Sequence, residues 1–280
     1  MADATRPEIG TVADAGGIKT NYLEAGDGPP VVLIHGSGPG VTSYANWRLV
    51  IPELAKNFRV VAPDMVGFGF SERPEGVRYG LDTWANQTVA LMDTLGLDKV
   101  KLVGNSFGGA IALRIATRLP DRVDKLVLMG SMGVPFPITE GLDRVWGYEP
   151  SFENMRAVLD VFAYSRAIVN DELAEVRYRG SIEPGFQESF SAMFPADESG
   201  SRQRWVEAMT TPEEELRALP HRTLIVHGRE DAVIPVQNSY DLMGLIDNAD
   251  LAVFSHCGHW SMIERTADFN RLVRDFFLGE

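Results

Sequence analysis

The sequence has little cysteine and no long apolar run. Its 280 residues include one cysteine, Cys257, which excludes an intramolecular disulfide and a cysteine-rich metal site. Such low usage fits a reducing compartment. No stretch approaches the roughly 18 consecutive apolar residues of a membrane-spanning helix, and residues 1–8 lack the basic-then-apolar pattern of a secretory signal. We therefore expect a cytoplasmic protein with no membrane partner.

Positive charge is also scarce. The chain has 26 Lys and Arg against 39 Asp and Glu, a formal net charge of −13. Nucleic-acid binding needs clustered Lys and Arg to neutralise phosphates, so this balance argues against a nucleic-acid partner. It does not exclude an acidic small molecule, because one or two local arginines can hold a carboxylate.

Metal-ligand spacings and phosphate-binding loops are absent as well. The five histidines form neither an H-x-x-x-H nor an H-E-x-x-H pattern, so we expect no metal site. The glycine-rich segment 35–40 lacks the lysine of a G-x-x-x-x-G-K-[ST] loop. The sequence gives no reason to expect a cofactor.

Short β-prone runs alternate with helical patterns along most of the chain. This alternation predicts an α/β protein with a mostly parallel sheet flanked by helices. Several of the runs are continuously apolar, as in strands covered on both faces. The predicted strands are residues 19–23, 31–34, 59–62, 100–104, 125–129, 223–226 and 251–254. The clearest helical periods are residues 83–95, 109–119, 237–246 and 267–277.

The alternation stops between about residues 135 and 219. This stretch has helical runs at 154–164 and 171–179, a Met- and aromatic-rich section at 186–209, and no predicted strand. About eighty residues are too many for one crossover connection. We therefore predict a core domain of residues 1–134 and 215–280 and a helical cap (lid) domain of residues 135–214.

The segment 104–108, Gly-Asn-Ser-Phe-Gly, has the spacing G-x-S-x-G. It follows a predicted strand and opens a predicted helix, which is the setting of a nucleophile elbow. Glycine lets neighbouring backbone approach a strained turn, and the helix N-terminus offers free N–H groups and a positive end to the reacting atoms. Ser106 is therefore the predicted nucleophile. The alternative is a glycine-rich helix N-cap.

A serine nucleophile needs a histidine base within hydrogen-bond reach, oriented by a carboxylate. His259 follows the last predicted strand and is the favoured base, with His256 as its competitor. We expect His227 to pack beside the sheet and His221 to lie in a surface loop.

The predicted acid is Asp231, which directly follows the predicted strand 223–226. Asp64 also follows a strand, but its glycine-rich setting indicates a carboxylate that fixes a turn. For the oxyanion hole, the residue after the nucleophile supplies one N–H, that of Phe107. The second donor is expected from the loop 35–40, at Ser37 or alternatively Gly38.

These motifs resemble those of the α/β-hydrolase fold family over essentially the whole chain. More narrowly, the sequence is similar to the meta-cleavage product hydrolases. The resemblance rests on residues 35–40, 46–47, 104–109, 177–178, 228–231 and 255–260. It implies hydrolysis of the C5–C6 carbon–carbon bond of 2-hydroxy-6-oxohexa-2,4-dienoates by a Ser-His-Asp triad in bacterial aromatic degradation. The implied products are a 2-hydroxypenta-2,4-dienoate and a carboxylic acid.

The resemblance also implies a set of substrate-binding residues. Arg177 would clamp the substrate carboxylate, Asn46 and Asn105 would hydrogen-bond it or the adjacent oxygen, and Trp260 would line the site near the dienol. Gly38 is placed in the same set. Simpler interpretations exist, because Arg177 could be a solvated helix charge and Trp260 a core residue.

Phe107 and the Ser-x-Gly-Pro loop are similar to the branch that acts on products of monocyclic aromatics. We therefore expect a small substituent at C6, either hydrogen or a short alkyl group. Residues named as candidates for bounding that pocket are Ile138, Trp146, Phe162 and Val233. The resemblance further implies a homodimer or a higher homo-oligomer.

Three matters stay open at the level of sequence. The reaction can proceed through an acyl-enzyme or through attack of an activated water that gives a gem-diol. A carboxylesterase or lactonase would keep the triad without needing Arg177 or Asn46. A non-catalytic small-ligand receptor could use the same scaffold, because fold alone does not fix function.

Overall fold

The computed structural model describes residues 6–279, so residues 1–5 and residue 280 of the predicted core domain lie outside the described residues. One eight-stranded sheet has the order β1-β2-β4-β3-β5-β6-β7-β8. The strands are β1 (Thr11–Asp14), β2 (Lys19–Ala25), β3 (Pro30–Ile34), β4 (Arg59–Pro63), β5 (Val100–Asn105), β6 (Val123–Met129), β7 (Arg222–Gly228) and β8 (Ala249–Phe254). Only the β1–β2 and β2–β4 pairs are antiparallel. The predicted α/β fold with a mostly parallel sheet is confirmed.

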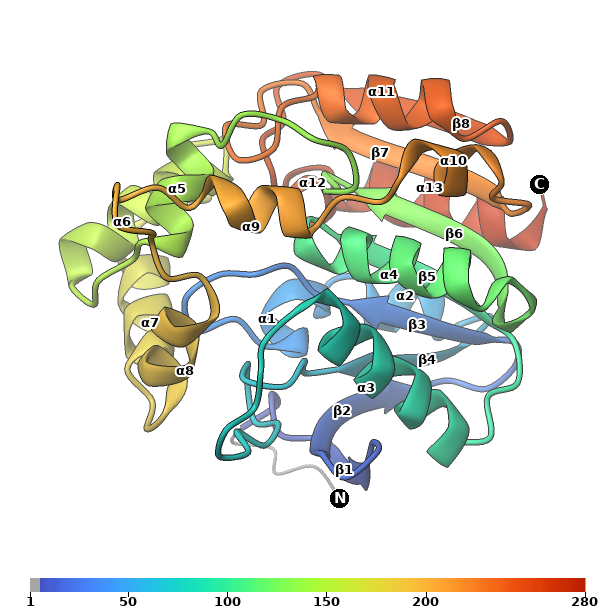
Figure 1. Cartoon of the computed structure of the whole chain (residues 1–280), viewed down its shortest axis with the longest axis horizontal. Coiled ribbons are helices and arrows are strands. Elements are labelled where there is room, and N and C mark those ends of the chain that lie inside the picture. Colours follow the sequence, from blue (N-terminus) through green and yellow to red (C-terminus); the bar gives the residue numbers. More distant parts are fainter. Residues whose placement is uncertain (1–5, 280) are drawn as a thin grey trace.

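Helices lie on both faces of the sheet. Figure 1 shows α3 and α4 covering one face, with α2 and α13 on the other. The helices are α1 (Ser43–Trp47), α2 (Ile51–Leu54), α3 (Leu81–Thr94), α4 (Phe107–Arg118), α5 (Glu140–Trp146), α6 (Phe152–Phe162), α7 (Asp171–Ser181), α8 (Phe186–Met193), α9 (Gln203–Ala208), α10 (Glu213–Arg217), α11 (Gln237–Leu245), α12 (Ser261–Glu264) and α13 (Thr266–Leu278), with a 3₁₀ turn at Pro120–Arg122.

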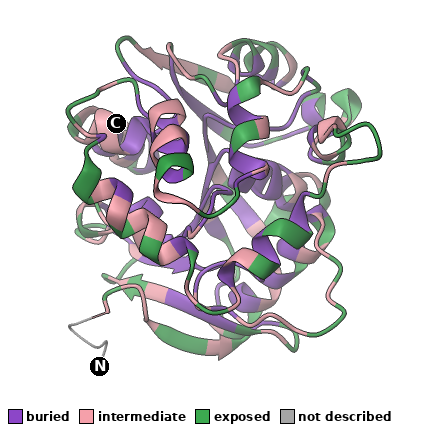
Figure 2. Cartoon of the chain, turned by 90° about the vertical axis from the view of Figure 1, so that its left-hand side faces the viewer, coloured by how far each residue is buried: buried purple, intermediate pink, exposed green. Residues whose placement is uncertain are grey.

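The central strands are buried because helices cover them on both sides. Val31 to Ile34 in β3 are at most 1% exposed, and the apolar residues of β5 and β6 are equally enclosed. Figure 2 shows this concentration of buried residues in the interior, with exposed residues on the outer surfaces. The continuous apolar runs of the sequence are therefore the parallel strands of the core.

One strand was not predicted. The residues of β1, Thr11–Asp14, form a four-residue edge strand that is largely exposed and pairs only with β2. Such a strand needs no apolar run, so hydrophobic periodicity does not reveal it. The other predicted strands are all present, and the structure lengthens each by one to three residues.

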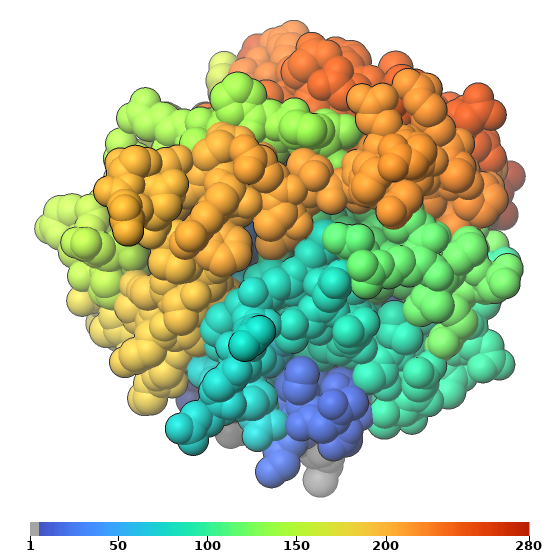
Figure 3. Space-filling view, viewed as in Figure 1, coloured from blue at the N-terminus to red at the C-terminus, as the bar shows by residue number. Residues whose placement is uncertain are grey.

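Helices α5 to α9 lie between β6 and β7, and no described residue in that interval belongs to a strand. They gather on one side of the sheet, at the left of Figure 1. Trp146 and Phe194 stack within this group, with ring centroids 4.4 Å apart. This group of helices contacts the core where Ser189 Oγ donates to the Gly67 carbonyl at 2.7 Å. Figure 3 shows the yellow-orange helical segment lying against the cyan part of the core.

None of the helices formed by residues 6–279 is long and apolar enough to cross a membrane.

Candidate active site

The site residues come from loops at one edge of the sheet. Ser106 directly follows β5, Asp231 lies just past β7, and His259 lies past β8. The carboxyl ends of parallel strands meet at a common edge, where open α/β sheets bind ligands. The topology alone therefore brings together residues that are far apart in the sequence.

Ser106 occupies a strained turn. Its φ of 55° and ψ of −116° lie outside the regions that side chains favour. The turn is held because the Ser106 N–H donates to the Met129 carbonyl at 2.8 Å, and the Ser106 carbonyl accepts from Met132 N–H at 3.1 Å. The side chain makes no capping hydrogen bond to α4. The geometry therefore favours a nucleophile on a strained turn, buried at 2% exposure, over the simple N-cap interpretation.

Glycine is required on both sides of this serine. A Cβ atom on Gly104 would lie 2.4 Å from the Gly108 carbonyl oxygen, and one on Gly108 would lie 2.3 Å from the Ile34 carbonyl oxygen. Both distances are far below contact, so no larger residue fits without moving the backbone. The G-x-S-x-G spacing thus follows from the packing of β5 and α4 against β3.

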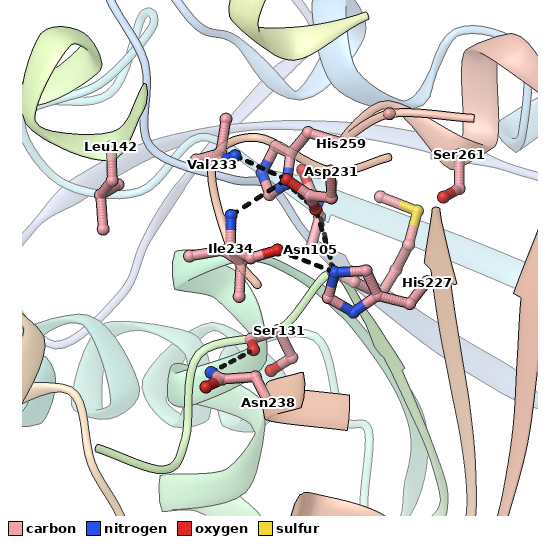
Figure 4. Close-up of polar contacts among 12 residues, drawn as sticks. Asn105, Ser131, Leu142, His227, Asp231, Val233, Ile234, Asn238, His259 and Ser261 are labelled. Atoms are coloured by element: carbon pink, nitrogen blue, oxygen red, sulfur yellow. Dashed lines mark hydrogen bonds and ion pairs between the residues drawn. The ribbon is translucent and has the colours of Figure 1, made fainter. Parts of the chain in front are cut away.

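The Asp231 side chain is fully buried and is surrounded by four N–H groups. Its Oδ1 accepts from the backbone N–H of Val233 at 2.8 Å and of Ile234 at 2.9 Å. Its Oδ2 lies 2.7 Å from Nδ1 of His259 and 3.1 Å from Nε2 of His227. Figure 4 shows these contacts converging on the carboxylate.

These contacts decide the charge state of Asp231. Burial by itself raises the pKa of Asp231, but the charge of His259 and the hydrogen bonds from His227 and His259 outweigh it. The net effect holds the pKa of this carboxyl well below its ordinary value. Asp231 is therefore an anion at neutral pH and can orient an imidazole.

His259 is 3% exposed and is held at both its ring and its backbone. Because Nδ1 donates to Asp231, the neutral ring leaves Nε2 free to accept a proton. The backbone N–H donates to the Phe162 carbonyl at 2.8 Å, and the Phe162 ring lies nearly parallel to the imidazole at 5.8 Å. Within the described part of the chain, no hydrogen bond joins the Ser106 hydroxyl to the His259 ring.

The other histidines lie elsewhere. His256 is exposed, has a φ of 52° and contacts Tyr164 instead of Asp231. His221 was expected in a surface loop; it lies in the loop before β7, but the expected surface position was wrong. It is 5% exposed, and its Nε2 lies 2.9 Å from the Pro120 carbonyl oxygen.

The loop after β3 is fixed by His35. Its Nδ1 lies 2.8 Å from the Gly36 carbonyl oxygen, and its Nε2 accepts the Met65 N–H at 2.9 Å. Burial lowers the pKa of His35 despite the nearby Asp64, which keeps the ring neutral as this pattern requires. Asp64 accepts backbone N–H groups from Ser43 and Phe70, as expected of a turn-fixing carboxylate.

The two predicted oxyanion-hole donors make no hydrogen bond within the described residues. Among residues 6–279, neither the Ser37 N–H nor the Phe107 N–H has a hydrogen-bond partner. The Ser37 hydroxyl accepts the indole N–H of Trp146 at 2.9 Å. Phe107 opens α4, so its N–H belongs to the free donors of a helix N-terminus.

The amide side chains of Asn46 and Asn105 flank the loop after β3. Asn46 Oδ1 accepts the Gly36 N–H at 3.3 Å, and Asn105 Nδ2 donates to the Met129 carbonyl at 3.3 Å. A Cβ atom on Gly36 would lie 2.7 Å from Asn105 Oδ1. Asn46 Nδ2 is buried and has no partner in the described chain, so it retains a donor for another molecule.

Arg177 lies on α7 and faces the loop after β3. Its Nη2 donates to the Pro39 carbonyl at 3.4 Å, whereas its Nε is buried without a partner, and no described carboxylate pairs with it. Burial, and secondarily the like charge of Arg48, lowers the pKa of Arg177 to about 10. The side chain stays cationic at neutral pH, so Arg177 is not a fully solvated helix charge.

A groove of about 440 Å³ lies beside Arg177. Its lining includes Gly40, Thr42 and Arg48 but none of Ser106, Asp231 and His259. The groove therefore lies between α1 and α7 and is separate from Ser106, Asp231 and His259.

Trp260 and Gly38 both contact Phe162, one of the pocket candidates. The Trp260 ring lies nearly parallel to the Phe162 ring at 4.8 Å. A Cβ atom on Gly38 would lie 3.5 Å from Phe162 Cζ. Trp260 is 9% exposed, so packing accounts for most of its surface. Phe162 thus joins α6 to both the β3 loop and the β8 loop.

His227 contacts a predicted site residue, although the sequence analysis did not include it in the site. It was expected beside the sheet, where it lies, but it also contacts Asp231. The one available signal was its position four residues before Asp231, at the end of the same strand. Across residues 6–279, no cluster of three His, Cys, Asp or Glu side chains could hold a metal ion.

Comparisons with known proteins place this geometry in a family. Residues 29–266 match the model of the alpha/beta hydrolase fold family. The chain is 58% identical over 275 residues to a 2-hydroxymuconate semialdehyde hydrolase from a Pseudomonas species, covering 98% of this chain and 96% of the relative. It is 56% identical over 273 residues to a 2-hydroxy-6-oxo-2,4-heptadienoate hydrolase from Pseudomonas putida, with 98% of each chain covered.

A solved structure agrees with these relatives. The meta-cleavage product hydrolase CumD from Pseudomonas fluorescens superposes with a TM-score of 0.95 at 56% identity, covering 97% of this chain and 98% of the other. Sequence and structure thus lead to one conclusion: the chain belongs to the meta-cleavage product hydrolases of the alpha/beta hydrolase fold family.

Proposed function

We propose that this protein hydrolyses the C5–C6 bond of 2-hydroxy-6-oxohexa-2,4-dienoates, giving a 2-hydroxypenta-2,4-dienoate and a carboxylic acid. The names of the relatives support this reaction. The observation that carries it is the pair of unsatisfied buried donors, Arg177 Nε and Asn46 Nδ2. A simple esterase needs no such donors, whereas a dienoate presents a carboxylate to them.

Ser106, His259 and Asp231 are the proposed triad. Ser106 is the nucleophile, His259 is the base, and Asp231 holds the ring with Nε2 unprotonated. The free N–H groups of Phe107 and Ser37 would hold the oxyanion. Arg177, Asn46, Asn105, Gly38 and Trp260 are the proposed substrate contacts.

The bond cannot break directly, because the departing carbon would leave as an unstabilised carbanion. Loss of the proton of the 2-hydroxyl and protonation at C5 first give a keto tautomer, in which C5 can later leave as part of a stabilised enolate. His259 would manage this proton. The carboxylate clamp would keep the substrate chain aligned during the shift.

Ser106 would then attack the C6 carbonyl and pass its proton to His259. Collapse of the tetrahedral intermediate breaks C5–C6 and leaves an acyl group on Ser106, and His259 returns its proton to the departing dienolate, which leaves as the 2-hydroxypenta-2,4-dienoate. Water, activated by His259, would hydrolyse the ester to the carboxylic acid. The strained Ser106 backbone supports this route over the gem-diol route, because such strain is typical of a nucleophile elbow.

We propose that residues 135–214 form the cap over this site. The contacts of Trp146 with Ser37 and of Phe162 with His259 support this division. A C6 substituent of hydrogen or short alkyl is proposed because the relatives are named for a semialdehyde and a heptadienoate. A homo-oligomeric state and a cytoplasmic location stay predictions.

The test is the loss of visible absorbance when purified protein meets 2-hydroxy-6-oxohepta-2,4-dienoate, beside its 6-phenyl analogue and p-nitrophenyl acetate. We expect fast bleaching of the methyl compound, slower loss of the phenyl compound and weak ester cleavage. The Ser106→Ala variant should bind the dienoate with its colour intact and turn over at least about 10³-fold more slowly. Brisk ester cleavage without bleaching would make the protein an esterase.

A further inference from the structure

His227 is a second histidine against the carboxylate of the triad. The ring is fully buried at the end of β7. Its Nε2 hydrogen-bonds the Ile234 carbonyl oxygen at 3.0 Å and lies 3.1 Å from Asp231 Oδ2. On its other side, Nδ1 lies 2.6 Å from the Ser239 hydroxyl on α11. Figure 4 shows the ring below Asp231, with its contacts to Asp231 and Ile234 drawn.

The surroundings assign the proton of this ring. Nε2 faces two acceptors, the Ile234 carbonyl and the Asp231 carboxylate, so Nε2 carries a hydrogen. The hydroxyl of Ser239 can then donate to Nδ1, which leaves the ring neutral. The imidazole is thus fixed from both ends and cannot turn without losing a partner.

The same contacts hold the loop 231–234, which carries Asp231, in place. The Ile234 N–H donates to Asp231 Oδ1, and the Ile234 carbonyl accepts from His227. His227 belongs to β7, so the loop is tied back to the rigid sheet. An apolar side chain of similar size would leave the Ile234 carbonyl without this donor and Asp231 Oδ2 with His259 alone.

We propose that His227 is a positioning residue for the reaction: it fixes Asp231 and the loop 231–234 so that Oδ2 faces Nδ1 of His259. It acts through Asp231 and His259 and needs no contact with the substrate. The inference rests on the proposed function for its dienoate assay, but any chemistry run by this triad would depend on it.

The experiment compares His227→Leu with His227→Gln in the full-length protein. Leucine fills the space without a donor, whereas glutamine can place an amide N–H near the position of Nε2. His221→Leu is the matched control, because His221 is also buried and bonded to a carbonyl but lies away from Asp231. Circular dichroism and thermal unfolding establish that each variant is folded.

For His227→Leu we expect kcat to fall about 10-fold or more with KM within about twofold, since one hydrogen bond to a charged group is lost. The acidic limb of the kcat/KM profile should move to higher pH by about half a unit, because a less satisfied carboxylate favours the imidazolium more. The groups facing Asp231 are His227, His259 and Cys257, and the pKa of Cys257, about 12, keeps that thiol out of this range. His227→Gln should recover most of the kcat that His227→Leu loses and return the acidic limb of the kcat/KM profile toward its wild-type pH. His221→Leu should leave kcat and the acidic limb unchanged.

Equal losses in folded His227→Leu and His227→Gln would overturn the proposal, as would wild-type kcat and an unmoved limb in His227→Leu. If His227→Leu does not fold, Ser239→Ala is the deciding variant. We expect its kcat to be about threefold lower and the acidic limb of its kcat/KM profile to move to higher pH. An unchanged kcat and an unmoved limb in Ser239→Ala would overturn the proposal. If the wild-type protein cleaves p-nitrophenyl acetate but does not bleach the dienoate, the proposed substrate is refuted. The His227 variants are then compared with p-nitrophenyl acetate as the substrate.

Discussion

A Cβ atom placed on Gly130 would lie 3.2 Å from Nδ1 of His259 and 3.3 Å from Oδ2 of Asp231. Gly130 follows β6 and has a φ of +48°. The hydrogen bond between acid and base therefore passes directly over a glycine backbone.

Gly130→Ala should lower kcat by about 10-fold or more, because the added methyl group crowds the His259–Asp231 hydrogen bond. Stability should also fall by about 1 kcal/mol, since alanine is strained at a positive φ. Steady-state kinetics on the dienoate and urea unfolding measure the two effects.

The control is Gly96→Ala, which has a φ of +65° and no atom within 4 Å of the added Cβ. It should lose about 1 kcal/mol of stability and keep the wild-type kcat. A similar loss of kcat in both variants would mean that backbone strain, and not the contact with the triad, causes the defect.

Asp231→Asn should lower kcat by about 10⁴-fold, because an amide no longer selects the imidazole tautomer that accepts the serine proton. The protein should also lose about 2 kcal/mol of stability at pH 7, since hydrogen bonds to a buried charged group are weakened. Wild-type activity in a folded asparagine variant would contradict the assignment of the acid.

The stability difference between wild type and Asp231→Asn should depend on pH. The folded pKa of Asp231 lies below its unfolded value of about 3.9, so its contribution is complete above that value and falls as the pH drops below it. Urea unfolding at pH 7, 5 and 3 should give a difference that shrinks only at the lowest pH. A stability difference that grows as the pH falls would contradict the lowered pKa of Asp231 in the folded protein.

Arg177→Gln should lower kcat/KM for the dienoate by about 100-fold, because the substrate carboxylate loses charged hydrogen bonds. Cleavage of p-nitrophenyl acetate should be unaffected, since that ester has no carboxylate. Lysine at this position should recover only part of the loss, because it lacks the planar fork of arginine.

Arg179→Gln is the matched control for Arg177. Arg179 lies two residues further along α7, is exposed and pairs with Glu175 at 2.6 Å. Its replacement should leave dienoate kinetics within about twofold of wild type. Equal effects of the two variants would indicate general electrostatic attraction in place of a specific clamp.

Cys257 should resist thiol reagents in the folded protein. Burial raises the pKa of this thiol to about 12, so almost no thiolate exists at pH 8. An aromatic disulfide reagent should react slowly until denaturant is added, and one thiol per chain should then appear. Fast stoichiometric labelling of folded protein would contradict the burial of Cys257.

The sequence was sufficient for the elements that hydrophobic runs define. The parallel strands from β3 to β7 are largely buried, so their apolar runs are visible without a structure. The G-x-S-x-G spacing locates the sharp turn after β5. The edge strand β1 was missed because largely exposed residues leave no such run. The acid–base pairing of Asp231 with His259 followed from the order of the loops along the sheet.

Contacts between distant segments were not predictable in the same way. Gly130 carries no side chain to attract notice, and its nearness to His259 depends on how the loops after β6 and β8 pack. His221 was misjudged because its carbonyl partner, on Pro120, belongs to another part of the chain. Such relationships depend on three-dimensional packing that local patterns do not encode.

The placement of α5 to α9 between β6 and β7 has a consequence for how the protein is made. The ribosome completes the Ser106 elbow first, then the helical segment, and only afterwards the loops that carry Asp231 and His259. A nascent chain therefore holds its proposed nucleophile, Ser106, without its proposed base, His259, until the loop after β8 is made. If the proposed triad is right, a fragment that lacks the loops after β7 and β8 should be inert toward the substrate.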